Sequence, residues 1–325
     1  MISYDSFKNI VIESFLDYLP KDSVFEGVKL SVSKVNKVNC VLDGVTIVIA
    51  NSRFAPVIYI EQMYEYYKQC DDMRQTLSHF SEVVVDAVDE ISSDAQSMEF
   101  DFENMKSNIV FKLVNTNWNE GMLSSVPNRP FNDLSIVYTL IIDTGFDGSG
   151  TAIITNKLAK VLGLSESDLY ELAVNNTSRI LKPTVLPMGE CFKKCIGSDF
   201  EGDGVLTSED IDLIKSVVSN DDTGMWVITS SNHLNGACVV LCPGVLSALA
   251  TKLEDDLYLL PSSIHEFIAV KASSSELRSL LRMVPRVNVM NVSPNAQLSN
   301  GVYFYDRAMD KVCLATSKEF NVSTF

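Results

Sequence analysis

Basic residues are scarce in this sequence. The chain of 325 residues has 26 Lys and Arg against 42 Asp and Glu, which gives a formal net charge of −16. Such a charge repels nucleic-acid phosphates and anionic lipid surfaces, so we expect neither as a partner. No basic and apolar leader is visible, and the longest uncharged stretch, 224–251, is interrupted by Pro243-Gly244. We therefore expect a cytoplasmic protein that does not enter a membrane and binds a protein partner or a small ligand.

Histidine is scarcer still, and recognisable catalytic motifs are missing. The chain has three histidines, and His265 lacks the second histidine four residues further on that a zinc peptidase helix needs. Neither Ser262 nor Ser263 lies in a glycine-flanked elbow, and the glycine-rich stretch 145–150 has no phosphate-binding lysine. The sequence therefore favours a protein without catalytic activity. An enzyme whose site is assembled from distant residues is the alternative.

Cysteine is present in an odd number without a disulfide pattern. Seven cysteines are scattered along the chain, which is typical of a reducing compartment. Cys191 with Cys195, and Cys238 with Cys242, are pairs at a spacing of four. The second pair falls on a predicted strand, Ala237–Leu241, where residues four apart cannot share one zinc ion. Buried, small apolar side chains are the preferred interpretation.

The apolar patterning predicts an α+β fold of mixed or antiparallel sheets with packed helices and a helix-rich central segment. Residues 1–90 are predicted to form a helix, a small β-meander and two further helices. The meander has a hairpin turn at Asp43-Gly44, and the two helices break near Asp71-Asp72. Residues 97–325 are predicted to form a larger α+β domain. It contains an insert-like helix-loop-helix at about 187–222.

Several elements of the larger domain have local sequence signals. Ile109–Val114 and Leu134–Asp143 have the composition of strands. Ser165–Asp168 is a capping-box pattern that starts a helix, after a preceding helix that stops at Gly163. Ile264–Val270 is predicted to form a strand. On a regular strand the side chains of His265 and Glu266 face opposite sides of the sheet.

The stretch 199–210 has the pattern of a calcium-binding loop. Acidic residues occupy loop positions 1, 3, 5 and 12, and Gly204 occupies position 6, where the backbone turns sharply. An acidic surface loop that caps the following helix is the alternative interpretation. The predicted oxygen ligands for calcium, the one cofactor that the sequence indicates, are Asp199, Glu201, Asp203, Val205, Thr207 and Asp210.

The chain also resembles an uncharacterised bacterial group, Domain of Unknown Function family 5688. This resemblance implies no activity, because none is assigned to the family. It weakens between Pro183 and Gly224. The blocks that carry it are Pro56–Tyr67, Pro127–Leu134, Ile153–Asn156, Leu169–Thr177, Gly236-Ala237, Pro243–Leu246, Asp256–Glu266 and Val302–Asp306.

Residues 197–218 resemble, in addition, a single calcium-binding repeat of a dockerin. Glu201 stands where dockerins usually carry Asn or Asp, and the second repeat that presents a dockerin to its cohesin is missing. The resemblance therefore implies a lone ion site and not cohesin binding.

Four polar residues within the family-like blocks are the candidate binding residues: Arg129, Asp133, His265 and Glu266. Three functions follow from these observations. The preferred one is a non-catalytic interaction or regulatory protein with an accessory calcium site. The alternatives are a hydrolase-like enzyme that gathers the four residues in one cleft, and a calcium-responsive binding module.

Overall fold

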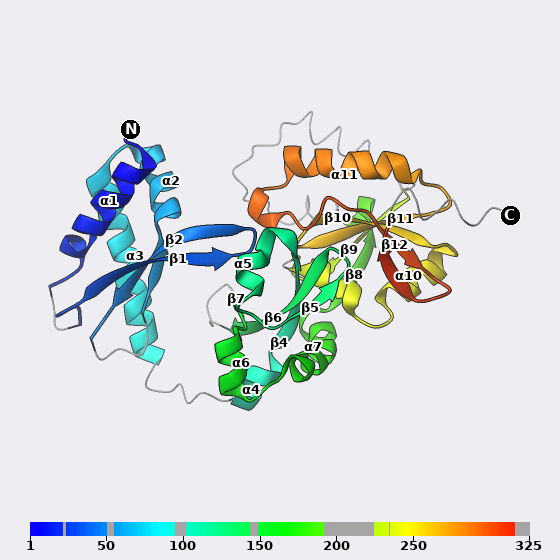
Figure 1. The fold of residues 1–325 in the computed structure, drawn as a ribbon, viewed down its shortest axis with the longest axis horizontal. Helices are drawn as coiled ribbons and strands as arrows, with labels where there is room; N and C mark the ends of the chain where they lie inside the picture. The colour runs from blue at the N-terminus through cyan, green and yellow to red at the C-terminus, as the bar shows by residue number, and fades with distance from the viewer. Residues whose placement is uncertain are drawn as a thin grey trace. The chain divides into compact units, whose positions relative to one another are not determined.

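The computed structural model divides into two compact units, Met1–Asp101 and Phe102–Phe325 (Figure 1). The boundary that the sequence predicts, between 90 and 97, falls at the end of helix α3 and in the residues that follow it. The structure describes residues 1–21, 24–50, 55–94, 102–143, 149–191, 224–233 and 235–315.

The N-terminal unit packs helices against a three-stranded antiparallel sheet of order β1-β2-β3. Phe7, Val11 and Phe15 recur every four residues and are fully buried, so one side of the first helix enters the core. The predicted break between two helices is confirmed at Asp71, which adopts a left-handed conformation. The elements are α1 (Tyr4–Ser14), η1 (Phe15–Tyr18), β1 (Lys29–Lys37), β2 (Cys40–Val48), β3 (Val57–Tyr59), α2 (Ile60–Cys70) and α3 (Met73–Asp94).

The Asp43-Gly44 pair does not form the hairpin turn that its sequence predicts. Lys37 pairs with Cys40, so the turn lies at positions 38 and 39. Asn39 there has a φ of 60°, a conformation that asparagine tolerates. Gly44 lies inside β2, where a Cβ atom would come within 2.6 Å of the Val35 side chain. Close packing, and not turn geometry, therefore requires glycine at this position.

The C-terminal unit contains two antiparallel sheets that share one apolar core. In the first, β6 pairs with β4, β5 and β7, and the second has the order β13-β12-β10-β11-β9-β8. The predicted α+β class is confirmed. The elements are α4 (Phe102–Ser107), β4 (Ile109–Asn115), η2 (Asn117–Asn119), α5 (Glu120–Leu123), β5 (Asn128–Phe131), β6 (Leu134–Asp143), β7 (Ser149–Ile153), α6 (Asn156–Leu162), α7 (Glu166–Leu181), β8 (Pro183–Pro187), β9 (Met225–Ser230), η3 (Gly236–Leu241), α10 (Val245–Leu253), β10 (Leu257–Ser263), β11 (Glu266–Lys271), α11 (Leu277–Asn291), η4 (Pro294–Ala296), β12 (Tyr303–Asp306) and β13 (Lys311–Leu314).

The six-stranded sheet is apolar on both faces. Successive side chains of a strand point to opposite faces. Leu257 and Leu259 accordingly belong to the main core, whereas Tyr258 and Leu260 belong to a second cluster with Val284 of α11. Helix α11 therefore covers the face of this sheet that is turned away from the main core (Figure 1).

Two predicted strands near the core are wrong in detail. The stretch Ala237–Leu241 lies in the 3₁₀-helix η3 and not in a strand. Cys238 and Cys242 are buried, as the interpretation of small apolar side chains predicts, although not on a strand. The strand predicted at Ile264–Val270 begins at Glu266, because Ile264 and His265 form the turn between β10 and β11.

Candidate functional site

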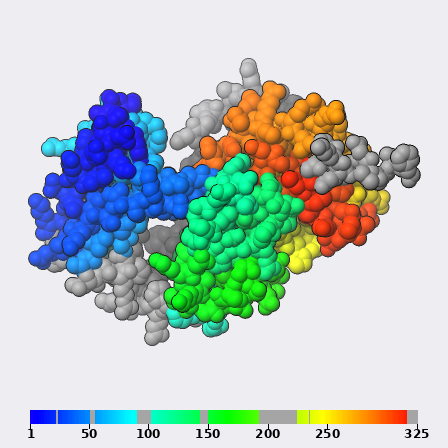
Figure 2. Space-filling model, viewed as in Figure 1, coloured from blue at the N-terminus to red at the C-terminus, as the bar shows by residue number. Residues whose placement is uncertain are grey.

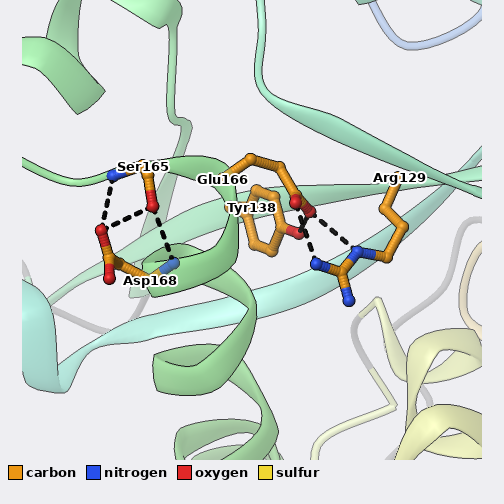
Figure 3. Close-up of polar contacts among 5 residues, drawn as sticks. All are labelled: Arg129, Tyr138, Ser165, Glu166 and Asp168. Carbon is orange, nitrogen blue, oxygen red and sulfur yellow. Dashed lines mark hydrogen bonds and ion pairs between the residues drawn. The ribbon is translucent and has the colours of Figure 1, made fainter.

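Arg129 of β5 is bound to the first residue of helix α7. Its guanidinium donates two hydrogen bonds to the Glu166 carboxylate, Nε at 3.0 Å and Nη2 at 2.9 Å. The Tyr138 hydroxyl donates to the same carboxylate (Figure 3). Arg129 also lies 3.7 Å from the centre of the Tyr170 ring. Burial by itself raises the pKa of Glu166, but the bonds from Arg129 and Tyr138 outweigh it and lower that pKa.

The start of α7 explains why Glu166 lies at this point. Ser165 and Asp168 form the predicted capping box, in which each side chain binds the backbone N–H of the other residue (Figure 3). An acidic residue in the first helical turn also interacts favourably with the helix dipole. The arrangement joins β5, β6 and α7. Because the Arg129 and Glu166 charges are paired with each other, the arrangement connects these three elements.

Asp133 lies in a second, separate network. Its two carboxylate oxygens accept hydrogen bonds from the Ser299 and Tyr303 hydroxyls, both at 2.6 Å. Burial raises the pKa of Tyr303, and the Asp133 charge raises it further, so the tyrosine stays protonated and acts as the donor. These contacts join residues more than 160 positions apart in the chain. Sequence spacing gives no signal for them.

His265 and Glu266 lie at the turn between β10 and β11. His265 is half-buried, and its Nδ1 accepts a hydrogen bond from the Asn235 backbone N–H at 3.0 Å. Glu266 accepts from the Ser262 hydroxyl at 3.0 Å. The alternation that would place the two residues on opposite faces does not apply, because His265 lies outside the strand.

The four candidate residues thus fall into separate networks. Within the part of the chain that the structure describes, no hydrogen bond or ion pair joins Arg129, Asp133 and His265 to one another. Each carboxylate is already satisfied by donors of its own. The contacts observed here join strands, helices and turns to one another.

The predicted calcium ligands, Asp199 to Asp210, lie outside the described residues. The described ranges themselves hold no cluster of His, Cys, Asp or Glu suited to a metal ion. In the same ranges, no helix combines the length and the apolar content needed to cross a bilayer.

Helix α11 presents a basic surface that the described residues of its own unit do not pair. Arg278, Arg282 and Arg286 are exposed and recur every four residues, so they lie along one side of the helix. None of the three forms an ion pair with a described residue. The helix lies on the outside of its unit (Figure 2, orange).

Apolar side chains lie next to these arginines. Val289 is 82% exposed and Met290 68%, while Met283 and Val287 are about two-fifths exposed. At 100° per residue, Met283, Val287 and Met290 form a stripe beside the arginines, and Val289 lies among them. We call the three arginines and these four apolar residues the α11 outer face.

The inner side of α11 is firmly attached. Val284 packs against the sheet, and the buried Asn288 side chain donates to the Ser299 carbonyl at 2.9 Å and to Asn300 at 2.8 Å. Pro285 removes one backbone hydrogen bond from the helix, so these tertiary contacts stabilise it where the helical ladder is interrupted. The α11 outer face therefore belongs to a helix whose inner side is packed and hydrogen-bonded to the rest of its unit.

These features define a two-unit α+β protein with a basic and apolar helix on the surface of its second unit. The chain belongs to the family of unknown function DUF5688, whose family model matches residues 4–307. The matched range includes nearly all of both units and confirms the family resemblance, whereas no match supports the dockerin-like repeat. No curated protein and no solved structure matches the chain.

Proposed function

We propose that this protein is a non-catalytic interaction protein that uses the α11 outer face to bind an acidic, partly apolar segment of another protein. The observation that carries the proposal is the pairing of three exposed arginines with four exposed apolar residues on one helix. Arginine and methionine are enriched in protein interfaces, whereas Lys, Glu and Asp are depleted there. The α11 outer face has this composition.

Charge indicates the chemistry of the partner. The stretch 277–305 contains no acidic residue, although the whole chain has a net charge of −16. The α11 outer face is thus a basic surface in an acidic protein, and carboxylates are the groups that arginine binds best in two-pronged geometry. Complementary charge speeds the encounter and sets the orientation, and the Met and Val side chains supply the apolar burial.

The net charge also argues against an extended anionic partner. A membrane or a nucleic acid presents many charges to the whole protein, so the remaining acidic surface would be repelled. A short peptide segment meets only the α11 outer face. Charges farther away than about 8 Å are screened from it at physiological salt.

The proposal is tested with three labelled helical peptides of one design. Each has a leucine stripe beside charged positions spaced by four, filled with glutamate, glutamine or lysine. We expect the full-length protein to bind the glutamate peptide at least tenfold more tightly than the glutamine peptide in fluorescence anisotropy. The Arg282→Glu/Arg286→Glu variant should lose the glutamate peptide and gain the lysine peptide. Such a charge exchange is specific to this surface.

The matched control carries the same change in net charge elsewhere. Arg74 and Arg307 are exposed and are not part of the α11 outer face, so Arg74→Glu/Arg307→Glu should bind the glutamate peptide as the wild type does. An equal loss of glutamate-peptide binding in both variants would mean that only the overall charge matters, and it would contradict the proposal. Binding to anionic vesicles or RNA that exceeds peptide binding would overturn it, and so would self-association through this face.

A further inference from the structure

A small cavity lies in the C-terminal unit, apart from the α11 outer face. Its volume is about 130 Å³. Strands β4, β6 and β7, the end of α7 and the loop after β9 contribute to its wall. The apolar lining residues include Val110, Phe111, Ile141, Ile180 and Leu181.

One polar group of this wall is buried without a partner. Thr139 of β6 is 2% exposed, and its hydroxyl has no hydrogen-bond partner among the described residues. It is the single side chain of the described part of the chain in this condition. A buried hydroxyl without a hydrogen-bond partner is unfavourable, so a ligand group that pairs with it gains free energy on binding.

The loop after β9 forms the polar side of the cavity with Asn232 and Asn235. Asn235 adopts a left-handed backbone, and its N–H is fixed by the imidazole of His265. Gly236 follows, at a point where a Cβ atom would lie 2.3 Å from the Ser230 backbone nitrogen. The close contacts around Gly236 thus require glycine at this position.

Lys112 of β4 gives the cavity a positive charge. It lines the wall, and none of the lining residues that the structure describes is acidic. Beyond the effect of burial, the Lys112 charge lowers the pKa of a neighbouring group, His265. Burial lowers the pKa of His265, and the nearby Lys112 lowers it further, so this imidazole is neutral and its Nδ1 serves as an acceptor. A cavity with a lysine in its described wall is suited to an anion, although the chain as a whole has a charge of −16.

We infer that this cavity binds a small carboxylate with a short apolar chain. Lys112 neutralises the carboxylate, the Thr139 hydroxyl and the asparagines of the loop donate hydrogen bonds, and the apolar wall takes the alkyl part. An apolar cavity of about 150 Å³ holds benzene, so the present volume suits a ligand of about six non-hydrogen atoms. Butyrate has this size. This binding site is independent of the proposed partner of α11.

The test compares three probes of equal length and different charge on the full-length protein: butyrate, butanol and butylamine. Saturation-transfer NMR should detect butyrate binding with a Kd at least tenfold below that of either other probe. Equal binding of all three would overturn the assignment to anions. No detectable butyrate binding at millimolar concentration would overturn the site itself.

Two substitutions locate the bound probe. Thr139→Val keeps the shape and removes the unpaired hydroxyl, so it should weaken butyrate binding at least fivefold while the ligand-free protein melts at the same or a higher temperature. Lys112→Met should weaken binding at least tenfold. The controls Thr184→Val and Lys157→Met lie outside the lining and should leave the Kd unchanged. Unchanged binding in Thr139→Val, or a lower melting temperature without ligand, would show that the hydroxyl has a structural partner and overturn its role.

Discussion

Two carboxylates, one in each unit, are stabilised in different ways. Asp43 in the N-terminal unit is buried and lies 2.9 Å from the ammonium groups of both Lys8 and Lys34. Asp133 in the C-terminal unit accepts hydrogen bonds from two neutral hydroxyls and forms no ion pair with a described residue. The first carboxylate is compensated by charge and the second by hydrogen bonding.

The two carboxylates also differ in which parts of their units they connect. Asp43 holds α1 and β1 to β2, and its backbone N–H donates to Glu61 of α2, so it ties together most elements of a small unit. Asp133 joins segments far apart in the chain across a much larger core. The two units can be followed separately, because both tryptophans, Trp118 and Trp226, belong to the C-terminal unit.

The largest expected effect is the loss of both cations around Asp43. Lys8→Met/Lys34→Met leaves a buried carboxylate without a counter-charge, and we expect unit 1 to lose about 3 kcal/mol of unfolding free energy. Circular dichroism in urea measures both units, and tryptophan fluorescence measures unit 2 alone. Adding Asp43→Asn should recover part of the loss. A loss below about 1 kcal/mol, or an equal shift in fluorescence, would contradict charge compensation.

Acid should act on the same group. Burial raises the pKa of Asp43, but hydrogen bonds from Lys8, Lys34 and Tyr4 outweigh it and lower the pKa from 3.8 to about 2. A pKa that is lower in the folded state contributes stability that is present above the unfolded value and lost as the pH falls from about 4 through 2. The difference corresponds to about 2 kcal/mol. Urea unfolding of wild type and Asp43→Asn between pH 2 and 6 measures it; identical pH dependence would contradict the assignment.

The hydroxyl-based site is tested with Tyr303→Phe. This variant removes one of the two donors to Asp133 at a fully buried position, so we expect unit 2 to lose about 2 kcal/mol in fluorescence-monitored unfolding. Tyr305→Phe is the matched control, because its hydroxyl donates to Asp310 in an exposed turn and should cost less than about 1 kcal/mol. Equal losses would mean that Asp133 needs no compensation from Tyr303.

Calcium should affect the C-terminal unit alone. The oxygen-rich pattern at 199–210 predicts one site, and at tenfold excess over its Kd calcium would stabilise that unit by about 1.4 kcal/mol. Calorimetry should show one site in the wild type and none in Asp199→Ala or Asp203→Ala. The N-terminal transition should not move. No heat and no stabilisation at millimolar calcium would remove the prediction.

The smallest effect is expected from removing the connection between β8 and β9. Pro187 pairs with Trp226, so the two ends of this connection lie side by side on neighbouring antiparallel strands. Replacing residues 188–223 with a short glycine-serine linker should therefore change the free energy of unit 2 by less than about 1 kcal/mol. Cooperative fluorescence-monitored unfolding measures this. An insoluble or non-cooperative variant would show that the segment belongs to the core.

Local sequence signals predicted local structure well. The capping box at Ser165 and the stop at Gly163 involve residues within a few positions of one another, so their geometry follows from the sequence. The Asp43-Gly44 signal failed because the same dipeptide also suits a buried acid followed by a residue in close contact with the Val35 side chain. No helix is predicted at α11, because Pro285 interrupts the helical pattern there. Arginines every four residues were the available signal.

The sequence by itself determined the α+β class, the family, the acidic charge and the helix ends near Asp71, Gly163 and Ser165, because these depend on composition, periodicity and neighbouring residues. The tertiary structure alone decided which polar groups meet. Sequence analysis groups four candidate residues: Arg129, Asp133, His265 and Glu266. In the folded chain their side chains form hydrogen bonds with different partners in separate networks. Contacts such as Asp133 with Tyr303 span 170 positions, and the register of distant strands, which no local pattern encodes, brings them together.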